Sequence, residues 1–331
     1  MKINPKDVSL GKLHNTLLGS VGPRPIAFAS TIDKNGNRNL SPFSFFNVFS
    51  ANPPIAIFSP AKSGRTNTQK DTYHNVKEVP ECVINIVNFP IVQQMSLSST
   101  AYGPEVDEFV KAGLTPIESE LVRPFRVKES PVQMECIVKE VIELGNEGGA
   151  GNLVICEVKL IHIDDAILNE EGMIDQHKID LVGRMGGDYY VRASGDALFE
   201  VPKPIRQKGI GVDALPEAIK NSAILTGNDL GMLGNVEELP TINENHFTEN
   251  WDLKQKAAQE LLGLEGKGSV MFGFSDNSND TFLINSEAEG SNKLTKTCTF
   301  SDKKKFEAII KRFLLDDSIE NHLDIIEFKE N

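Results

Sequence analysis

The sequence has few of the features that mark secreted, metal-binding or membrane proteins. Among 331 residues there are four cysteines, Cys82, Cys136, Cys156 and Cys298, and they form neither a CxxC pair nor a metal-type spacing. We therefore expect buried free thiols. No apolar run reaches the roughly 18 residues that a membrane helix needs, and the N-terminus has no apolar signal core. We expect a cytoplasmic protein without a membrane partner.

An excess of positive charge and several familiar catalytic motifs are also missing. The formal net charge is −13 and the pI is near 5.0, which argues against a nucleic-acid partner. An anionic ligand would need a local basic pocket, because the overall field repels it. The sequence contains no HExxH, no GxSxG, and no GxGxxG that opens a helix after a strand.

Length and charge together predict two units. Domains usually span about 100 to 200 residues, so 331 residues favour two. The net charge is −5 over residues 1–205 and −8 over the shorter stretch 206–331. This change predicts a boundary near 201–204, with an accessory α+β segment of unknown role after it.

The first 200 residues are dominated by short apolar runs bounded by turn residues, which predict strands at 25–32, 54–59, 82–89, 132–139 and 153–163. In 132–139 the apolar residues alternate with polar ones, which predicts one wet face. The glycine-rich stretch 145–152 lacks Gly-Lys-Ser/Thr, so we interpret it as a hairpin turn and not a phosphate loop. The few helical patterns are short, at 71–79, 91–98 and 106–112. Many strands with few helices predict an antiparallel barrel or sandwich.

After residue 205 the patterns predict a small α+β unit. Helices are expected over 213–221, over 254–262 and after a cap at Ser301. A hairpin is expected to pair 269–274 with 281–286, and the stretch 226–250 looks irregular.

Residues 37–46, NRNLSPFSFF, do not fit a plain core strand, because small hydrogen-bonding residues and a proline are set among phenylalanines. One interpretation is a hairpin arm with a bulge at Pro42. The other is a surface for a planar ligand rich in heteroatoms. Both stand on this stretch alone.

A set of phosphate-suited residues lies around it. Hydroxyls, a bidentate arginine and the start of a short helix together suit a phosphate monoester. The set comprises Arg24, Ser30, Thr31, Ser59, Lys62, Ser63, Arg65, Thr66, Lys70 and Thr72.

Several segments in order resemble the flavin reductase-like, FMN-binding split-barrel family. They are VGPRPIAFAST, an Asp-x-x-Gly turn, NLSPFSFF, NPPIAIFS, KDTYHNV, CVINIV, DEFVKAGL, ESPVQMEC, CEVKLIHIDD and GRMGGDYY. The resemblance covers roughly residues 10–200, and residues beyond about 205 have no counterpart in the minimal family. It implies a mainly β fold, an FMN-binding split β-barrel with short helices, to which the C-terminal α+β extension is added.

By the same resemblance, FMN binds at a homodimer interface. Asn39, Ser41 and Ser44 would then meet the polar edge of the isoalloxazine ring, and Pro42 and Phe43 would shape its apolar floor. The ribityl and phosphate groups would be held by Arg24, Ser30, Thr31, Ser59, Lys70, Asp71 and Thr72, with Arg65 from the phosphate-suited set. No metal is expected.

The implied reaction is hydride transfer from NADH or NADPH to the flavin, in which the protein supplies position and electrostatics. Arg184 and Tyr189 of GRMGGDYY are the candidates beside the flavin, although the motif also suits a glycine bend that closes the barrel. Two alternatives remain open: a fixed-FMN enzyme that acts on an organic substrate or electron carrier, and a non-enzymatic FMN-binding protein. A flavin-using monooxygenase is a possible partner.

Overall fold

A computed structural model of the chain describes residues 1–103, 105–201, 208–221 and 225–238, and the backbone of three strands between 268 and 298. By its internal contacts the structure divides into two compact units, residues 1–200 and 201–331. Within the described residues, no helix combines the length and the apolar character needed to span a membrane.

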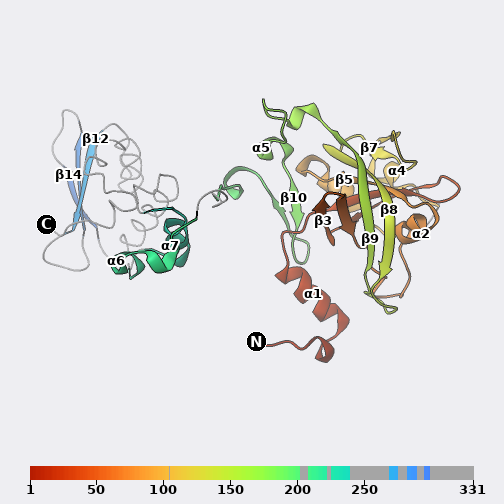
Figure 1. Ribbon diagram of the computed structural model, residues 1–331, viewed down its shortest axis with the longest axis horizontal. Coiled ribbons are helices and arrows are strands. Elements are labelled where there is room, and N and C mark those ends of the chain that lie inside the picture. The colour runs from red at the N-terminus through yellow and green to blue at the C-terminus, as the bar shows by residue number, and fades with distance from the viewer. Residues whose placement is uncertain are drawn as a thin grey trace. The chain divides into compact units, whose positions relative to one another are not determined.

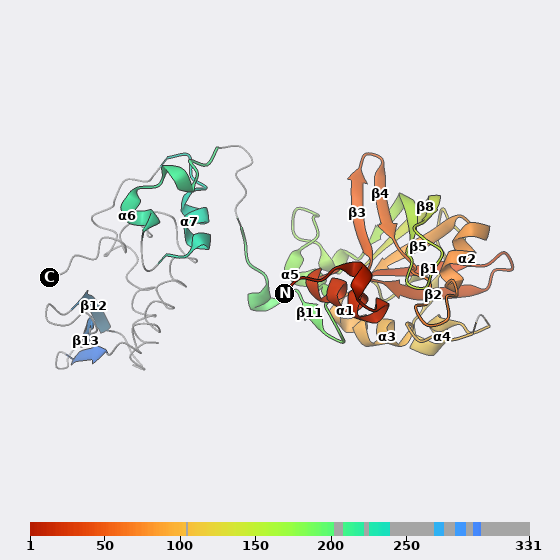
Figure 2. The same ribbon diagram turned by 90° about the horizontal axis from the view of Figure 1, so that it is seen from below.

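Seven antiparallel strands form the main sheet of the first unit, in the order β2-β1-β5-β8-β9-β4-β3. Their bounds are β1 (Ala27–Ile32), β2 (Arg38–Phe43), β3 (Phe46–Ala51), β4 (Pro54–Phe58), β5 (Glu81–Ile86), β8 (Val132–Glu143) and β9 (Asn152–Ile163). Figure 1 shows the long β8–β9 pair, and Figure 2 shows the β3–β4 hairpin projecting from the rest of the unit. The glycine-rich stretch joins β8 to β9 as a hairpin connection, which confirms that prediction.

The sheet curls until its two ends meet. Phe43 of β2 stacks on Phe58 of β4 with ring centroids 5.5 Å apart, although the two strands lie near opposite ends of the strand order. The Ser59 N–H also donates to the Phe45 carbonyl at 2.9 Å. In the described sheet the two edge strands, β2 and β3, share no ladder of hydrogen bonds, so the barrel is split between them. Small and branched side chains from its strands fill the interior, including Ala29, Cys82, Ile84, Cys136 and Cys156.

A second apolar cluster lies on the outer face of β1 and β2. Phe28 and Leu40 of the strands pack there with Met95 of α3 (Val92–Leu97) and Phe109 of α4 (Glu108–Ala112). The expected helices at 91–98 and 106–112 are therefore present but shorter. Because these two helices cover the strands from outside, the connection between them runs along β2.

The remaining elements of the first unit are short. They are the 3-10 helices η1 (Pro5–Asp7), η2 (Phe89–Ile91), η3 (Asp165–Ile167) and η4 (Gly195–Ala197), the helices α1 (Leu10–Ser20), α2 (Asp71–Glu78) and α5 (Gln176–Ile179), and the strands β6 (Pro116–Ile117), β7 (Arg126–Val127), β10 (Val182–Arg184) and β11 (Tyr190–Arg192). The sequence patterns did not predict α1, which Ser9 caps through its side-chain oxygen.

One of the two interpretations of residues 37–46 included a bulge at Pro42, and that bulge is not present. Pro42 pairs with Phe28 in an unbroken β1–β2 register, and the irregularity of this region lies between Val48 and Ser50 in the β3–β4 hairpin. The hairpin arm itself is confirmed, with the chain turning between Asp33 and Asn37.

The described part of the second unit holds η5 (Val212–Ala214), α6 (Glu217–Lys220), α7 (Gly227–Leu233) and a three-stranded antiparallel sheet, β12 (Gly268–Phe274), β13 (Phe282–Ala288) and β14 (Leu294–Cys298). The predicted hairpin is confirmed as β12–β13. The prediction of irregular structure over 226–250 is wrong at α7, because Thr226 and Asp229 form a capping box that begins this helix. The helices expected at 254–262 and after Ser301 fall outside the described residues.

Candidate functional site

Polar side chains from four parts of the chain surround a cavity of about 390 Å³ beside β2, which we call the hydroxyl cavity. Asn39 and Ser41 of β2 form one wall. The segment from Ser63 to Thr72 and the stretch from Ser98 to Tyr102 form the others, with Glu108 of α4. The cavity is thus lined mainly by hydroxyl and amide groups, which suit a ligand with many hydrogen-bonding oxygens.

Two cations in this cavity have no partner. Arg65 and Lys70 line it, and neither side chain forms a hydrogen bond or ion pair with any described residue. Lys70 also stands at the N-cap of α2, where no side chain caps the helix. Because a helix N-terminus carries unpaired N–H groups and partial positive charge, the three features together suit a phosphate.

Buried hydrogen bonds fix the β2 wall of the hydroxyl cavity. The Asn39 Oδ1 atom accepts from Thr72 Oγ1 at 2.8 Å and from Thr31 Oγ1 at 3.2 Å. The Glu108 carboxylate accepts from the Leu40 N–H at 3.0 Å and from Asn39 Nδ2 at 3.3 Å. Asn39 is therefore held on both sides of its amide, which fixes the position of the strand that borders the cavity.

Glu108 is an unusual wall residue because the residue is only 6% exposed and yet borders the hydroxyl cavity. Burial raises the pKa of this carboxyl, while the hydrogen bond from the Leu40 N–H opposes the rise. The nearby carboxylates of Asp71 and Asp107 raise the pKa further. Sequence patterns did not single out Glu108, although it stands in the family-like segment DEFVKAGL.

A second cavity, of about 450 Å³, lies at the end of β2 near Pro42 and Ser44, and we call it the Arg184 cavity. Its lining consists of Ile26, Pro42, Ser44, Gln93, Met95, Ser96, Ser99, Arg184, Asp188 and Tyr190. Ser99 lines both cavities. A ligand that crosses β2 near Ser41 and Pro42 would therefore meet polar groups on one side and a partly apolar, arginine-containing space on the other.

The structure separates the expected cofactor residues into two groups. Eight of them line a cavity: Asn39, Ser41, Arg65, Lys70, Asp71 and Thr72 in the hydroxyl cavity, and Pro42 and Ser44 in the Arg184 cavity. Five line neither: Arg24, Ser30, Thr31, Phe43 and Ser59. Phe43 points into the barrel core, and the Ser59 hydroxyl accepts from the Asn152 N–H at 3.1 Å. Of the thirteen residues expected from the sequence, eight thus line a cavity and five do not.

Arg24 is one of the five residues that line neither cavity. Its guanidinium donates to the carbonyl oxygens of Leu18, Val21 and Met185 at 2.6, 2.5 and 2.9 Å. These bonds use the donors that a phosphate would need, so the geometry favours a structural role that ties α1 to the segment after β10. Of the two candidates beside the flavin, Arg184 lines the second cavity, whereas Tyr189 is 78% exposed and lines neither. The neighbouring Tyr190 takes its place.

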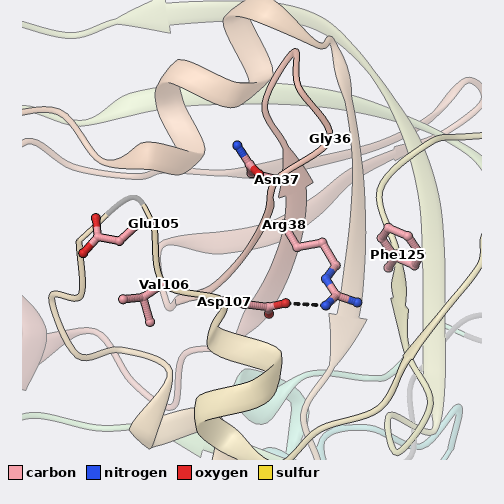
Figure 3. A pocket seen from close by; sticks show the side chains of 7 residues that line it. All are labelled: Gly36, Asn37, Arg38, Glu105, Val106, Asp107 and Phe125. Atoms are coloured by element: carbon pink, nitrogen blue, oxygen red, sulfur yellow. Dashed lines mark ion pairs between the residues drawn. The ribbon is translucent and has the colours of Figure 1, made fainter.

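A third cavity, of about 530 Å³, lies at the turn end of β2 and is drawn in Figure 3. Its arginine, Arg38, points toward Asp107 and forms an ion pair with it, while the guanidinium lies 5.4 Å from the Phe125 ring centroid. Glu105 adds a second carboxylate to the lining. A cavity with two carboxylates and one arginine that is already paired does not suit an anionic ligand. Among the described residues no cluster of three or more His, Cys, Asp or Glu could hold a metal ion.

Comparison with known proteins identifies the family of this chain. The model of the flavin reductase like domain matches residues 19–179. An uncharacterized protein of Aquifex aeolicus is 37% identical over 201 residues, which cover 61% of this chain and all of that protein. The chain belongs to the flavin reductase-like family. Family membership makes it a flavin-related oxidoreductase.

The solved structures agree with the split barrel. Nitrilotriacetate monooxygenase component B from Bacillus cereus matches with a TM-score of 0.57 and 32% identity, over 61% of this chain and 98% of that one. A Shewanella frigidimarina protein assigned as a flavin reductase with a split barrel domain matches with a TM-score of 0.52 and 27% identity, over 61% and 99%. The mainly β, split-barrel fold predicted from the resemblance is confirmed.

Proposed function

We propose that the protein binds FMN across the two cavities and works as an NAD(P)H-dependent flavin reductase. The observation that carries the proposal is the hydroxyl cavity, where two unpaired cations and the uncapped N-terminus of α2 meet. The donor set fits the phosphate of FMN, which carries nearly two negative charges and several acceptor oxygens. Bound FMN would supply the acceptor for a hydride from a nicotinamide dinucleotide, which is the chemistry of the cofactor.

The residues of this chain bind and orient. Arg65 and Lys70 hold the phosphate against the first turn of α2, and Ser41 and Thr72 offer hydroxyls to the ribityl chain. Pro42 and Ser44 face the ring from the Arg184 cavity. Glu108 and Asn39 keep β2 in place through the hydrogen bonds described above. No side chain is required as a general acid or base, because a hydride carries both electrons with its proton.

A homodimer is part of the proposal. The β3–β4 hairpin exposes Phe49 and Val48, and α1 exposes Leu10 and Leu17. The His14 and Phe45 rings are 6.4 Å apart, so the start of the hairpin lies beside α1. Apolar side chains gathered in this way indicate a surface that another molecule covers, and a second copy is the commonest solution for a soluble chain.

The partner and the compartment follow from analogy. One matched structure is named as a monooxygenase component B, so we propose that reduced flavin from this protein serves a flavin-using monooxygenase. We also propose that it works in the cytoplasm.

A turnover assay tests the proposal and separates its rivals. A flavin reductase oxidises NADH or NADPH at a rate that rises with added free flavin. A protein with fixed FMN ignores added flavin and turns over only with an organic substrate or electron carrier. An FMN-binding protein without activity oxidises neither nucleotide. Measurement of nucleotide oxidation at several free FMN concentrations therefore distinguishes the three, and the second or third result would overturn the reductase.

A further inference from the structure

The hairpin β10–β11 is held against the barrel by contacts that only glycine permits. A Cβ atom on Gly183 would lie 2.7 Å from the Pro23 Cβ, and one on Gly186 would lie 2.9 Å from the Gly19 Cα. Between these glycines, the Arg184 N–H donates to the Arg24 carbonyl at 2.8 Å, and the Arg24 N–H donates to the Arg184 carbonyl at 2.9 Å. The backbone of Arg184 is therefore fixed at the edge of the Arg184 cavity.

The Arg184 guanidinium is held in position but remains largely unused. It lies 4.6 Å from the Tyr190 ring centroid, and its side chain is 26% exposed. Its acidic neighbour Asp188 is fully exposed at 3.8 Å, a distance and setting in which ion pairs contribute little. Its other contact, to the Tyr189 carbonyl, is 3.5 Å long. Most of its five N–H donors thus remain available for a ligand.

Three other arginines close to the barrel show what a structural role looks like here. Arg24 is bound to three carbonyls, Arg38 forms an ion pair with Asp107, and Arg192 makes two 2.8 Å bonds to the Asp180 carboxylate. Arg184 has no comparable partner among the described residues. In a chain of net charge −13, a cation of this kind in a cavity is the local basic site that an anionic ligand needs.

We propose that the Arg184 cavity binds the anionic part of the second substrate, with Arg184 as the anion anchor and Tyr190 as its support. The inference rests on the proposed function: FMN fills the hydroxyl cavity and its ring reaches the Arg184 cavity only at Pro42 and Ser44, so the part beside Arg184 is left for the second substrate. The shared chemistry is a planar or tetrahedral oxyanion. Its source is the pyrophosphate of a nicotinamide dinucleotide or the carboxylate of an organic acceptor.

The first experiment compares Arg184→Ala, Arg184→Lys and the control Arg123→Ala, which removes an exposed arginine paired with Glu81 on the surface. Each FMN-loaded variant is reduced anaerobically by NADH and by 1-benzyl-1,4-dihydronicotinamide, which carries no phosphate. We expect Arg184→Ala to weaken the apparent affinity for NADH about ten- to hundredfold and to leave the uncharged donor within about twofold. Arg184→Lys should recover part of the loss, because it keeps the charge without the planar fork.

The second experiment measures binding without turnover. Inorganic pyrophosphate and benzoate are titrated into the FMN-loaded protein by calorimetry. Arg184-dependent binding of pyrophosphate supports the dinucleotide source, and Arg184-dependent binding of benzoate alone supports the organic carboxylate. If no dihydronicotinamide reduces the protein, the reductase proposal fails while this titration still decides the anion site. Failure of both anions to bind, or equal results for Arg184→Ala and Arg123→Ala in both experiments, would overturn the inference.

Discussion

At the residue scale, the cations around the barrel differ in what their donors already bind. Lys70 and Arg65 have no partner among the described residues and face the hydroxyl cavity, whereas Arg24 is bound to three carbonyls. The sequence shows only that these residues are basic and lie near small hydroxyl residues. Which of these cations faces a cavity and which is bound by carbonyls depends on where α1 and β10 pack against the barrel. No local sequence pattern shows where these elements pack.

Lys70→Ala should weaken the binding of FMN and leave the binding of riboflavin nearly unchanged. A charge-assisted contact is worth roughly 1.5 to 3 kcal/mol, or about one to two decades of affinity. Flavin fluorescence titration of both ligands measures the discrimination. An equal loss for FMN and riboflavin would show that Lys70 does not contact the phosphate.

Arg24→Ala should instead lower the stability of the fold. The substitution removes three part-buried hydrogen bonds, to the carbonyls of Leu18, Val21 and Met185, and each such bond contributes about 0.5 to 1.5 kcal/mol. Urea unfolding of the flavin-free protein measures this cost. A stable variant that loses only its preference for FMN over riboflavin would restore Arg24 as a phosphate ligand.

Glu108 gives the stability a pH dependence of known sign. Because burial raises the pKa of its carboxyl in the folded state, the folded protein binds this proton more tightly than the unfolded chain. The stability linked to it is fully present below the ordinary pKa of a glutamate and is lost as the pH rises through the raised value. Relative to Glu108→Gln, the wild-type free energy of unfolding should fall with pH over this range, while Asp71 and Asp107 are common to both proteins. Urea unfolding from about pH 4 to about pH 8 measures the difference, and parallel profiles would contradict it.

At the scale of elements, the strands were predictable because each buried run has its own apolar pattern. β1 and β4 lie within the expected ranges, β8 and β9 extend them, and β5 overlaps its expected range but begins and ends earlier. Helix α1 was missed although Leu10, Leu13 and Leu17 recur at helical spacing, and it buries no residue in the single chain. The wet face expected for β8 is only partly wet: Glu135 is fully buried and accepts the N–H groups of Glu120 and Leu121. The alternation of apolar and polar residues shows which side chains of a strand are polar, but not whether they are exposed. Here the loop with Glu120 and Leu121 covers the polar face, and the pattern within β8 does not show that.

The candidate site shows the same limit. Eight of the expected cofactor residues line the two cavities, because they cluster on or just after β2 and around the start of α2. Glu108, Tyr190 and the supporting role of Arg24 depend on tertiary contacts between segments far apart in the chain. The spacing of residues in the sequence could not predict these three roles.

Gly186→Ala tests whether close packing of the β10–β11 hairpin positions Arg184. The added Cβ would meet the Gly19 backbone at 2.9 Å, and forced overpacking costs about 1 to 3 kcal/mol. We expect lower stability and weaker NADH binding, with FMN binding unchanged. Gly11→Ala is the matched control, because nothing lies within 4 Å of its Cβ position. Thermal unfolding and NADH titration of both variants give the comparison, and identical behaviour would rule out the packing role.

At the scale of the whole molecule, the account proposes a dimer whose interface includes the β3–β4 hairpin. Phe49→Asp places a charge on a side chain that is 64% exposed in the single chain, so it should leave the fold intact. We expect dissociation to a 36.4 kDa particle and weaker FMN binding. Met173→Asp, at a residue 65% exposed, is the control. Light scattering measures the mass, and a Phe49→Asp dimer with full FMN would exclude the hairpin from the interface.

The second unit is proposed to be accessory, because every residue assigned to FMN lies before residue 200. A chain that ends at residue 203 should then fold and bind FMN within about tenfold of the full chain, a difference of about 1.4 kcal/mol. Flavin titration of the two proteins measures this. Insoluble or flavin-free truncated protein beside normal full-length protein would make residues 206–331 part of the site.

The central claim is that FMN bound in these two cavities accepts a hydride from a nicotinamide dinucleotide. Anaerobic mixing of the FMN-loaded protein with NADH and with NADPH tests it most directly, with the visible flavin absorbance followed over time. The account predicts that at least one nucleotide bleaches the flavin fully, with one nucleotide oxidised per flavin, and that Arg184→Ala slows this at low nucleotide concentration. Flavin that stays oxidised with excess of both nucleotides, in a protein that binds FMN well, would contradict it.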